Sequence, residues 1–86
     1  MYVARSKQFD KQYQKLPRKV KKQFGERLKL FFDDENHPLL HTHILSGEYR
    51  GCKSFNVNAD VRAVFMIRDT GTVYFSAIGS HSELYG

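Results

Sequence analysis

Cysteine, proline and long apolar runs are scarce in this sequence of 86 residues. Its single cysteine, Cys52, cannot form an intrachain disulfide, and no Cys/His spacing typical of a metal site is present, so a reducing cytoplasm fits the sequence. No apolar run approaches the roughly 20 residues that a membrane-spanning helix needs. The N-terminal segment lacks the apolar core of a signal peptide. We therefore expect a cytoplasmic protein without a cofactor, a metal centre or a membrane segment.

Positive charge exceeds negative charge. The sequence contains fourteen Lys and Arg residues and nine Asp and Glu residues, which gives a formal net charge of +5. Of all residues, 41% are hydrophobic. This hydrophobic share is typical of a folded chain, and the length predicts a single domain over residues 1–86. The positive charge favours a polyanionic partner such as nucleic acid, or an acidic protein. A basic protein without such a partner remains an alternative.

The stretch from Tyr49 to Tyr85 predicts three strands followed by a short polar tail. Turn residues separate the strands at Asn58-Ala59-Asp60 and at Asp69-Thr70-Gly71, where Gly71 can adopt a positive φ. Such short connections permit only antiparallel neighbours. The β-branched and aromatic residues that predict the strands are Phe55, Val57, Val61, Val64, Phe65, Ile67, Val73, Tyr74, Phe75 and Ile78.

The first half of the chain predicts a short strand and two helices. We predict a short strand, added to the sheet, at Tyr2-Val3-Ala4. Ser6 can cap a helix over residues 7–16. Pro17 interrupts this helix, and a second one should run from about residue 17 to 34. The apolar faces of the two helices consist of Phe9, Tyr13 and Leu16, and of Val20, Phe24, Leu28 and Phe31. We therefore predict an α+β fold in the order β-α-α-β-β-β, with a helical hairpin packed on one face of an antiparallel sheet. Residues 39–47 should form a loop or a short extended piece.

Basic side chains lie between the apolar positions of the second predicted helix. They could form a nucleic-acid-binding face, with Lys21 and Lys22 as candidate contacts. They could equally be a solvated helix surface, which is the commoner case for such runs. The basic residues concerned are Arg18, Lys19, Lys21, Lys22, Arg27 and Lys29.

Arg62 stands inside an apolar strand. Alternation places Arg62, Val64 and Met66 on one face, and Val61, Ala63, Phe65 and Ile67 on the other. A buried, unpaired charge is unfavourable, so Arg62 needs a wet face or a partner. Two interpretations stay open, namely an ion pair with Asp60 or Glu48, and a contact with a phosphate, for which the guanidinium group is well suited.

Histidines and the C-terminal tail supply the other candidate groups. His81 follows the last predicted strand, where a rigid sheet can present it to solvent, and histidine exchanges protons near neutral pH. Ser80 and Ser82 could orient its ring, and Tyr85 could stack on a base. His41 and His43 would share a face of an extended segment, but no carboxylate or thiol completes a metal-binding set.

Three segments together resemble the RelE/ParE superfamily of toxin–antitoxin modules, and most of all its YafQ-like branch. The likeness covers nearly the whole chain and is sharpest at residues 43–51 (HILSGEYRG), 58–65 (NADVRAVF) and 78–85 (IGSHSELY). It implies a toxin that cuts messenger RNA in the ribosomal A site, needs no cofactor, and is held inactive in a complex with a cognate antitoxin. Ribosome and messenger RNA would be its other partners.

The resemblance also implies roles for individual residues. His43, Asp60 and His81 match active-site positions of YafQ-like enzymes, Tyr85 replaces a C-terminal aromatic residue, and Arg62 resembles the strand arginine of RelE. We expect His43 or Asp60 to act as base, Arg62 to bind the phosphate, His81 to act as acid and Tyr85 to stack on a base. Candidate RNA contacts beyond these are Arg50, Lys53, Asn56, Lys21 and Lys22.

Two positions depart from the family pattern. Asn56 stands where YafQ-like chains can carry another active-site histidine, and Ala77 stands where a last-strand arginine occurs. Lys53 is a candidate replacement for that charge, although alternation places it with Phe55 and Val57 on the core side.

Two other functions remain as alternatives. One is a ParE-like inhibitor of DNA gyrase that acts by protein binding, and the other is a basic adaptor without activity. Fold cannot separate them from a nuclease. His43 and His81 favour the nuclease, because a binding module does not need groups that titrate near neutral pH.

Overall fold

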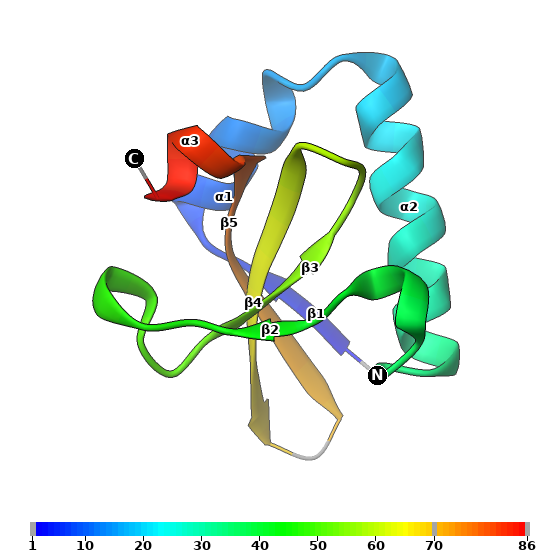
Figure 1. Ribbon diagram of the computed structural model, residues 1–86, viewed down its shortest axis with the longest axis vertical. Coiled ribbons are helices and arrows are strands. Elements are labelled where there is room, and N and C mark those ends of the chain that lie inside the picture. The colour runs from blue at the N-terminus through cyan, green and yellow to red at the C-terminus, as the bar shows by residue number, and fades with distance from the viewer. Residues whose placement is uncertain (1, 70, 86) are drawn as a thin grey trace.

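The computed structural model describes residues 2–69 and 71–85 and has the α+β architecture that the sequence predicted (Figure 1). Within these residues no helix is both long enough and apolar enough to cross a membrane. The elements in chain order are β1 (Tyr2–Arg5), α1 (Lys7–Gln14), α2 (Arg18–Asp33), a 3₁₀ turn (Pro38–Leu40), β2 (His43–Ile44), a second 3₁₀ turn (Gly47–Tyr49), β3 (Lys53–Asn56), β4 (Val61–Asp69), β5 (Thr72–Ser80) and α3 (His81–Tyr85).

The strands of the described residues form one sheet in the order β1-β5-β4-β3-β2. The predicted meander is confirmed, because β3, β4 and β5 pair antiparallel in succession. Gly71 adopts the expected positive φ of 97°, whereas Thr70 of the same predicted turn lies outside the described residues. The prediction of a wholly antiparallel sheet is wrong, because β1 runs parallel to β5. Short turns permit only antiparallel pairing of the strands that they connect. The chain between β1 and β5 includes the whole helical hairpin and is long enough for a parallel pair.

Six phenylalanines form the centre of the core between the helical hairpin and the sheet. Phe31 of α2 contacts Phe65 of β4 edge to face, with ring centroids 4.9 Å apart. The ring centroids of Phe9 in α1 and Phe75 in β5 are 5.5 Å apart. Burial of each such ring contributes on the order of 1.5–3 kcal/mol. The predicted apolar stripes of both helices are confirmed, since every member is buried or packs against this cluster. The six rings are those of Phe9, Phe24, Phe31, Phe55, Phe65 and Phe75.

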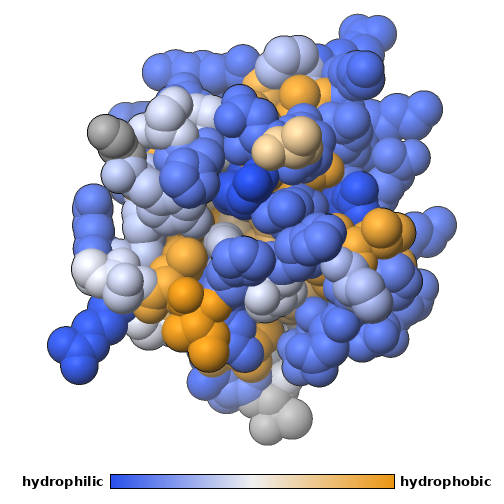
Figure 2. Space-filling model, viewed as in Figure 1, coloured by the Kyte–Doolittle hydropathy of each residue, from blue (hydrophilic) through white to orange (hydrophobic). Residues whose placement is uncertain are grey.

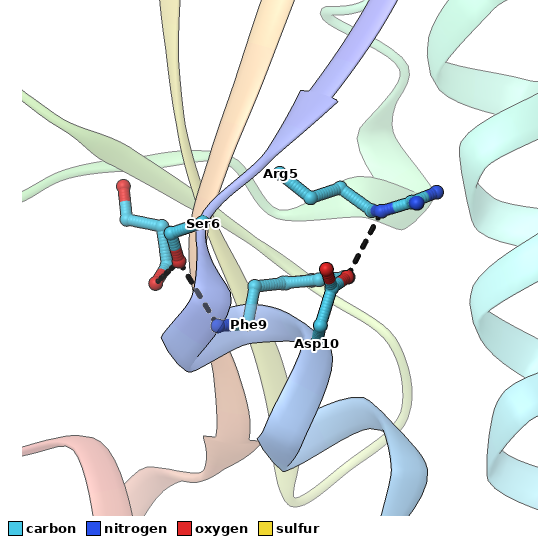
Figure 3. Close-up of polar contacts among 5 residues, drawn as sticks. Arg5, Ser6, Phe9 and Asp10 are labelled. Atoms are coloured by element: carbon cyan, nitrogen blue, oxygen red, sulfur yellow. Dashed lines mark hydrogen bonds and ion pairs between the residues drawn. The ribbon is translucent and has the colours of Figure 1, made fainter.

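Helix α1 follows β1 in the chain and lies along the part of β5 beyond the residues that pair with β1. Ser6 caps α1 as predicted, because its Oγ accepts a hydrogen bond from the Phe9 amide at 2.9 Å. The same hydroxyl donates to the Ser76 carbonyl at 2.8 Å, and Gln12 Oε1 accepts from the Ile78 amide at 2.9 Å. Figure 3 shows the Ser6 contacts next to the ion pair of Arg5 and Asp10, whose atoms lie 2.9 Å apart. The end of β5, which leads to the C-terminal residues, is therefore firmly held.

A smaller apolar cluster covers part of the other sheet face. The predicted alternation in β4 is confirmed: Val61, Ala63 and Phe65 belong to the core under the hairpin, whereas Val64 and Met66 belong to this second cluster. Leu84 packs there, because residues 81–85 form helix α3 and not the polar tail that the sequence predicted. The residues of the second cluster are Cys52, Val64, Ala77 and Leu84, with Leu45, Tyr49 and Met66 at its margin. Around this cluster the sheet face stays open to solvent.

Candidate active site

A pocket of about 370 Å³ lies on the sheet face that the helical hairpin leaves uncovered. It gathers side chains from β2 and the loop after it, from β3, from β4 and from α3. The surface seen in Figure 2 is mostly hydrophilic, with separate hydrophobic patches. The pocket is lined by His43, Leu45, Ser46, Ser54, Asn56, Arg62, His81 and Tyr85. Of the predicted catalytic residues it brings together His43, Arg62, His81 and Tyr85, and it adds the predicted RNA contact Asn56.

Strand register explains this gathering. Asn56 of β3 pairs with Arg62 of β4, and Arg62 pairs in turn with Gly79 of β5. His43 of β2 pairs with Ser54 of β3. Side chains at paired positions lie on the same face of a sheet, so these polar groups form a compact set. Because Gly79 has no side chain, Glu83 and Leu84 of α3 can lie close to the backbone of β5 at this position.

The half-buried guanidinium of Arg62 is attached to the turn between β3 and β4 by one of its nitrogens. Nη1 donates to the backbone carbonyls of Asn58 at 3.0 Å, Ala59 at 3.2 Å and Val61 at 3.3 Å. Within the described residues, neither Asp60 nor Glu48 forms the ion pair that the sequence left open, and no group accepts from Nε or Nη2. Arg62 can therefore offer these two donors to an anion in the pocket.

His81 is the first residue of α3. Its amide donates to the Asp60 carbonyl at 3.0 Å. Its ring meets the ring of Tyr85 edge to face with centroids 4.8 Å apart, and Tyr85 meets Tyr49 in the same way at 6.1 Å. The prediction that Ser80 and Ser82 orient the His81 ring is wrong: the two hydroxyls lie 3.4 Å from each other, and Tyr85 makes the contact with the ring.

Ser80 and Glu83 form a capping box at the start of α3. Ser80 Oγ accepts from the Glu83 amide at 3.1 Å, and Glu83 Oε1 accepts from the Ser80 amide at 2.8 Å. The hydrogen bond from the Ser80 amide is the main cause that lowers the pKa of the Glu83 carboxyl, and the Ser80 side chain and Lys15 add smaller effects in the same direction. The carboxylate is therefore ionised at neutral pH and available as an acceptor.

The remaining predicted site residues lie outside this pocket. Asp60 lines a separate groove of about 570 Å³ that also contains Lys15 and Glu83. Lys53 pairs with Phe65 and so shares the sheet face of the core, as alternation predicted, but its side chain is exposed. Arg50 follows the second 3₁₀ turn, and Lys22 is exposed on α2. Lys21 of α2 lies over the Tyr13 ring at 5.5 Å.

Sequence reasoning missed several lining residues. Ser54 is only 4% exposed and shares its face with Asn56, so the alternation within β3 could have revealed it. Leu45 and Ser46 belong to the segment 43–51 that carries the family resemblance, but no chemical or periodic signal singled them out. The other histidines have different positions: His37 Nδ1 accepts from the Leu39 amide at 3.1 Å, and exposed His41 has a φ of 47°. No three His, Cys, Asp or Glu side chains of residues 2–69 and 71–85 gather as metal ligands would.

Comparisons with known proteins complete the description of this site. A family model described as "Bacterial toxin of type II toxin-antitoxin system, YafQ" matches residues 1–86. The structure of YafQ from E. coli strain BL21(DE3) superposes with a TM-score of 0.82 and 17% identity, covering 98% of this chain and 97% of that one. The E. coli DinJ-YafQ toxin-antitoxin complex gives 0.79 and 18%, covering 98% and 96%. A YoeB/ParE toxin from Agrobacterium tumefaciens gives 0.79 and 15%, covering 94% and 99%. A comparison with curated protein sequences gave no match.

Proposed function

Because the chain belongs to the YafQ family of bacterial toxins of type II toxin-antitoxin systems, we propose that it is a ribosome-dependent endoribonuclease that cuts messenger RNA. One observation carries this proposal: two histidines and an arginine from distant parts of the sequence line a single open pocket. Cleavage of a phosphodiester by its own 2′-hydroxyl needs a base, an acid and a cation, and these side chains can supply all three. Because the proposed substrate is ribosome-bound messenger RNA, we expect the protein to act in the cytoplasm.

The proposed reaction assigns one role to each group. His43 takes the proton of the 2′-hydroxyl, whose oxygen then bonds to the neighbouring phosphorus atom. Arg62 holds the non-bridging oxygens through Nε and Nη2. His81 gives a proton to the 5′-oxygen as its bond to phosphorus breaks, which leaves a 2′,3′-cyclic phosphate and a 5′-hydroxyl. Tethering of the attacking hydroxyl to the phosphate favours this route over attack by water. Asp60, the other base that the sequence suggested, opens into a different groove, so His43 is the better candidate.

Because Asn56 and Ala77 depart from the family pattern, binding of the phosphate depends more strongly on the charge of Arg62. Ala77 is fully buried in the second cluster, and Lys53 does not line the pocket. Among the residues that line the pocket, Arg62 therefore carries the one permanent positive charge. Tyr85 is 39% exposed at the rim, where its ring can stack on a nucleobase.

Extracts that translate a defined messenger RNA test the proposal directly. The purified protein is expected to produce cuts within codons held in the ribosome, mapped by primer extension. The cuts should disappear when initiation is blocked. A gyrase inhibitor of the ParE type would leave the message intact and would block the supercoiling of a relaxed plasmid by gyrase. Intact message together with blocked supercoiling would overturn the nuclease proposal in favour of that alternative.

We further propose that an acidic antitoxin holds this chain inactive in a hetero-oligomer. The structural relative named DinJ-YafQ is a toxin-antitoxin complex, and the formal charge of +5 suits an acidic partner. The small acidic protein encoded beside this chain should relieve growth arrest on co-expression. Stopped-flow measurements should show that their association rate falls as salt rises, because charge attraction speeds encounter. A chain that is harmless when expressed alone, and binds no such protein, would contradict the toxin–antitoxin assignment.

A further inference from the structure

Helix α3 is too short to be stable by itself. It comprises five residues, His81–Tyr85, and isolated helices of this length do not persist in water. Its geometry therefore depends on contacts at its ends and along one side. Leu84 provides the side contact by packing into the second apolar cluster. Hydrogen bonds hold the backbone at the start of the helix, where His81 stands.

Two sets of hydrogen bonds hold that start. The first joins the His81 amide to the Asp60 carbonyl in the turn between β3 and β4. Carbonyls of the same turn, those of Asn58 and Ala59, accept from Arg62 Nη1. The turn is thus a common attachment point for Arg62 and His81. Its own shape is set by Asn58, whose Oδ1 accepts from the Asp60 and Val61 amides at 2.9 and 2.8 Å.

The second set is the capping box of Ser80 and Glu83. Its two bonds, at 2.8 and 3.1 Å, satisfy amides on both sides of His81. Glu83 itself is exposed and does not line the pocket of His43, Arg62 and His81. Its carboxylate lies close to the Gly79 backbone, since a β-carbon built on Gly79 would stand 3.2 Å from Glu83 Oε1. The capping box therefore joins the end of β5 directly to helix α3.

From this arrangement we infer that Glu83 is a positioning residue, which sets the direction of the His81 side chain through the Ser80–Glu83 capping box. The inference rests on the proposed function for its effect on catalysis, but the positioning is a structural property of its own. A small displacement of an acid or base can lower a rate by as much as about 10²-fold. The loss of the capping box should therefore act on the rate of cleavage and leave ribosome binding unchanged.

A matched pair of variants at Glu83 tests this inference. Glu83→Ala and Glu83→Gln remove the same charge, but only glutamine can still accept from the Ser80 amide. We expect Glu83→Ala to slow single-turnover cleavage of ribosome-bound messenger RNA by about 10- to 100-fold, with ribosome affinity within about twofold. Glu83→Gln should stay within about threefold of the wild type. Glu26→Ala is the control, because it removes the same charge from an exposed residue of α2 that lies outside the box and outside the pocket.

An NMR measurement separates positioning from activity. The Tyr85 ring, 4.8 Å from the His81 ring, shifts the His81 ring protons through its ring current. In Glu83→Ala these signals should move toward random-coil values, and in Glu83→Gln they should not. Unchanged ring-proton shifts in Glu83→Ala, or equal behaviour of the two Glu83 variants, would overturn the inference. Shifts as expected in a protein whose wild type cuts no RNA would support the positioning and overturn the nuclease proposal alone.

Discussion

His81→Ala is expected to slow single-turnover cleavage of ribosome-bound messenger RNA by roughly two orders of magnitude or more, because a positioned acid or base contributes about 10²–10⁴-fold to a rate. The fold should persist, since the His81 side chain is exposed and the hydrogen bond to Asp60 comes from its backbone. Binding to the ribosome and to the antitoxin should also persist. The cleavage rate in single turnover, the ribosome affinity and the melting temperature are the quantities to measure.

Two further variants test whether the slower cleavage of His81→Ala comes from the loss of proton transfer. His81→Gln keeps a polar side chain of similar length without the ability to transfer a proton near neutral pH, and it should be nearly as slow as the alanine variant. His41→Asn is the control, because His41 is exposed, lies outside the pocket, and has a φ of 47° that asparagine tolerates. It should cleave at the wild-type rate. If both His81 variants cleave within a few-fold of the wild type, or lose stability in step with activity, His81 is not the acid.

Arg62→Lys is the second large expected effect, a loss of roughly 10²–10³-fold in cleavage, which is the usual result of removing one donor to developing charge. Arginine can bind the turn carbonyls through Nη1 and still present Nε and Nη2 to a phosphate. Lysine has a single nitrogen and cannot do both. The pocket lining contains no second permanent positive charge to replace it.

Stability separates this role of Arg62 from a structural one. Arg62→Lys should melt close to the wild type, because an ammonium group can still donate to one of the carbonyls, whereas Arg62→Ala should melt somewhat earlier. Arg68→Lys is the matched control in the same strand, since Arg68 is exposed and lies over the Tyr74 ring at 3.9 Å. It should retain full activity. A lysine variant at position 62 that melts much earlier and still cuts at the wild-type rate would make Arg62 a residue of the fold only.

Much of the fold followed from local patterns. The spacing of Val20, Phe24, Leu28 and Phe31 predicted the buried side of α2, and Pro17 predicted the break before it. Alternation in β4 assigned Val64 and Phe65 to opposite faces. The family resemblance, carried by three short segments, is confirmed by the match over residues 1–86. These signals succeed because helix period, strand alternation and turn chemistry depend on neighbours within a few residues.

Other features depended on contacts between distant segments. Residues 81–85 read as a polar tail, because five residues cannot show a helical period, although the Ser80–Glu83 spacing of a capping box was present. The parallel pairing of β1 with β5 was missed, because nothing near Tyr2 specifies its partner strand. Asp60 was grouped with His43 and His81 by resemblance, yet its side chain opens into another groove and only its carbonyl reaches His81.

The sequence by itself determined the helices, the meander, the two faces of β4 and the kinds of side chain available for chemistry. Only the tertiary structure decided which of them meet. His43 joins the pocket through its pairing with Ser54, and Asn56 through its pairing with Arg62, while Lys53, one residue from Ser54, turns to the opposite face. The physical reason is register: a shift of one residue between paired strands moves every side chain to the other face, and register is set by packing and turns across the whole sheet.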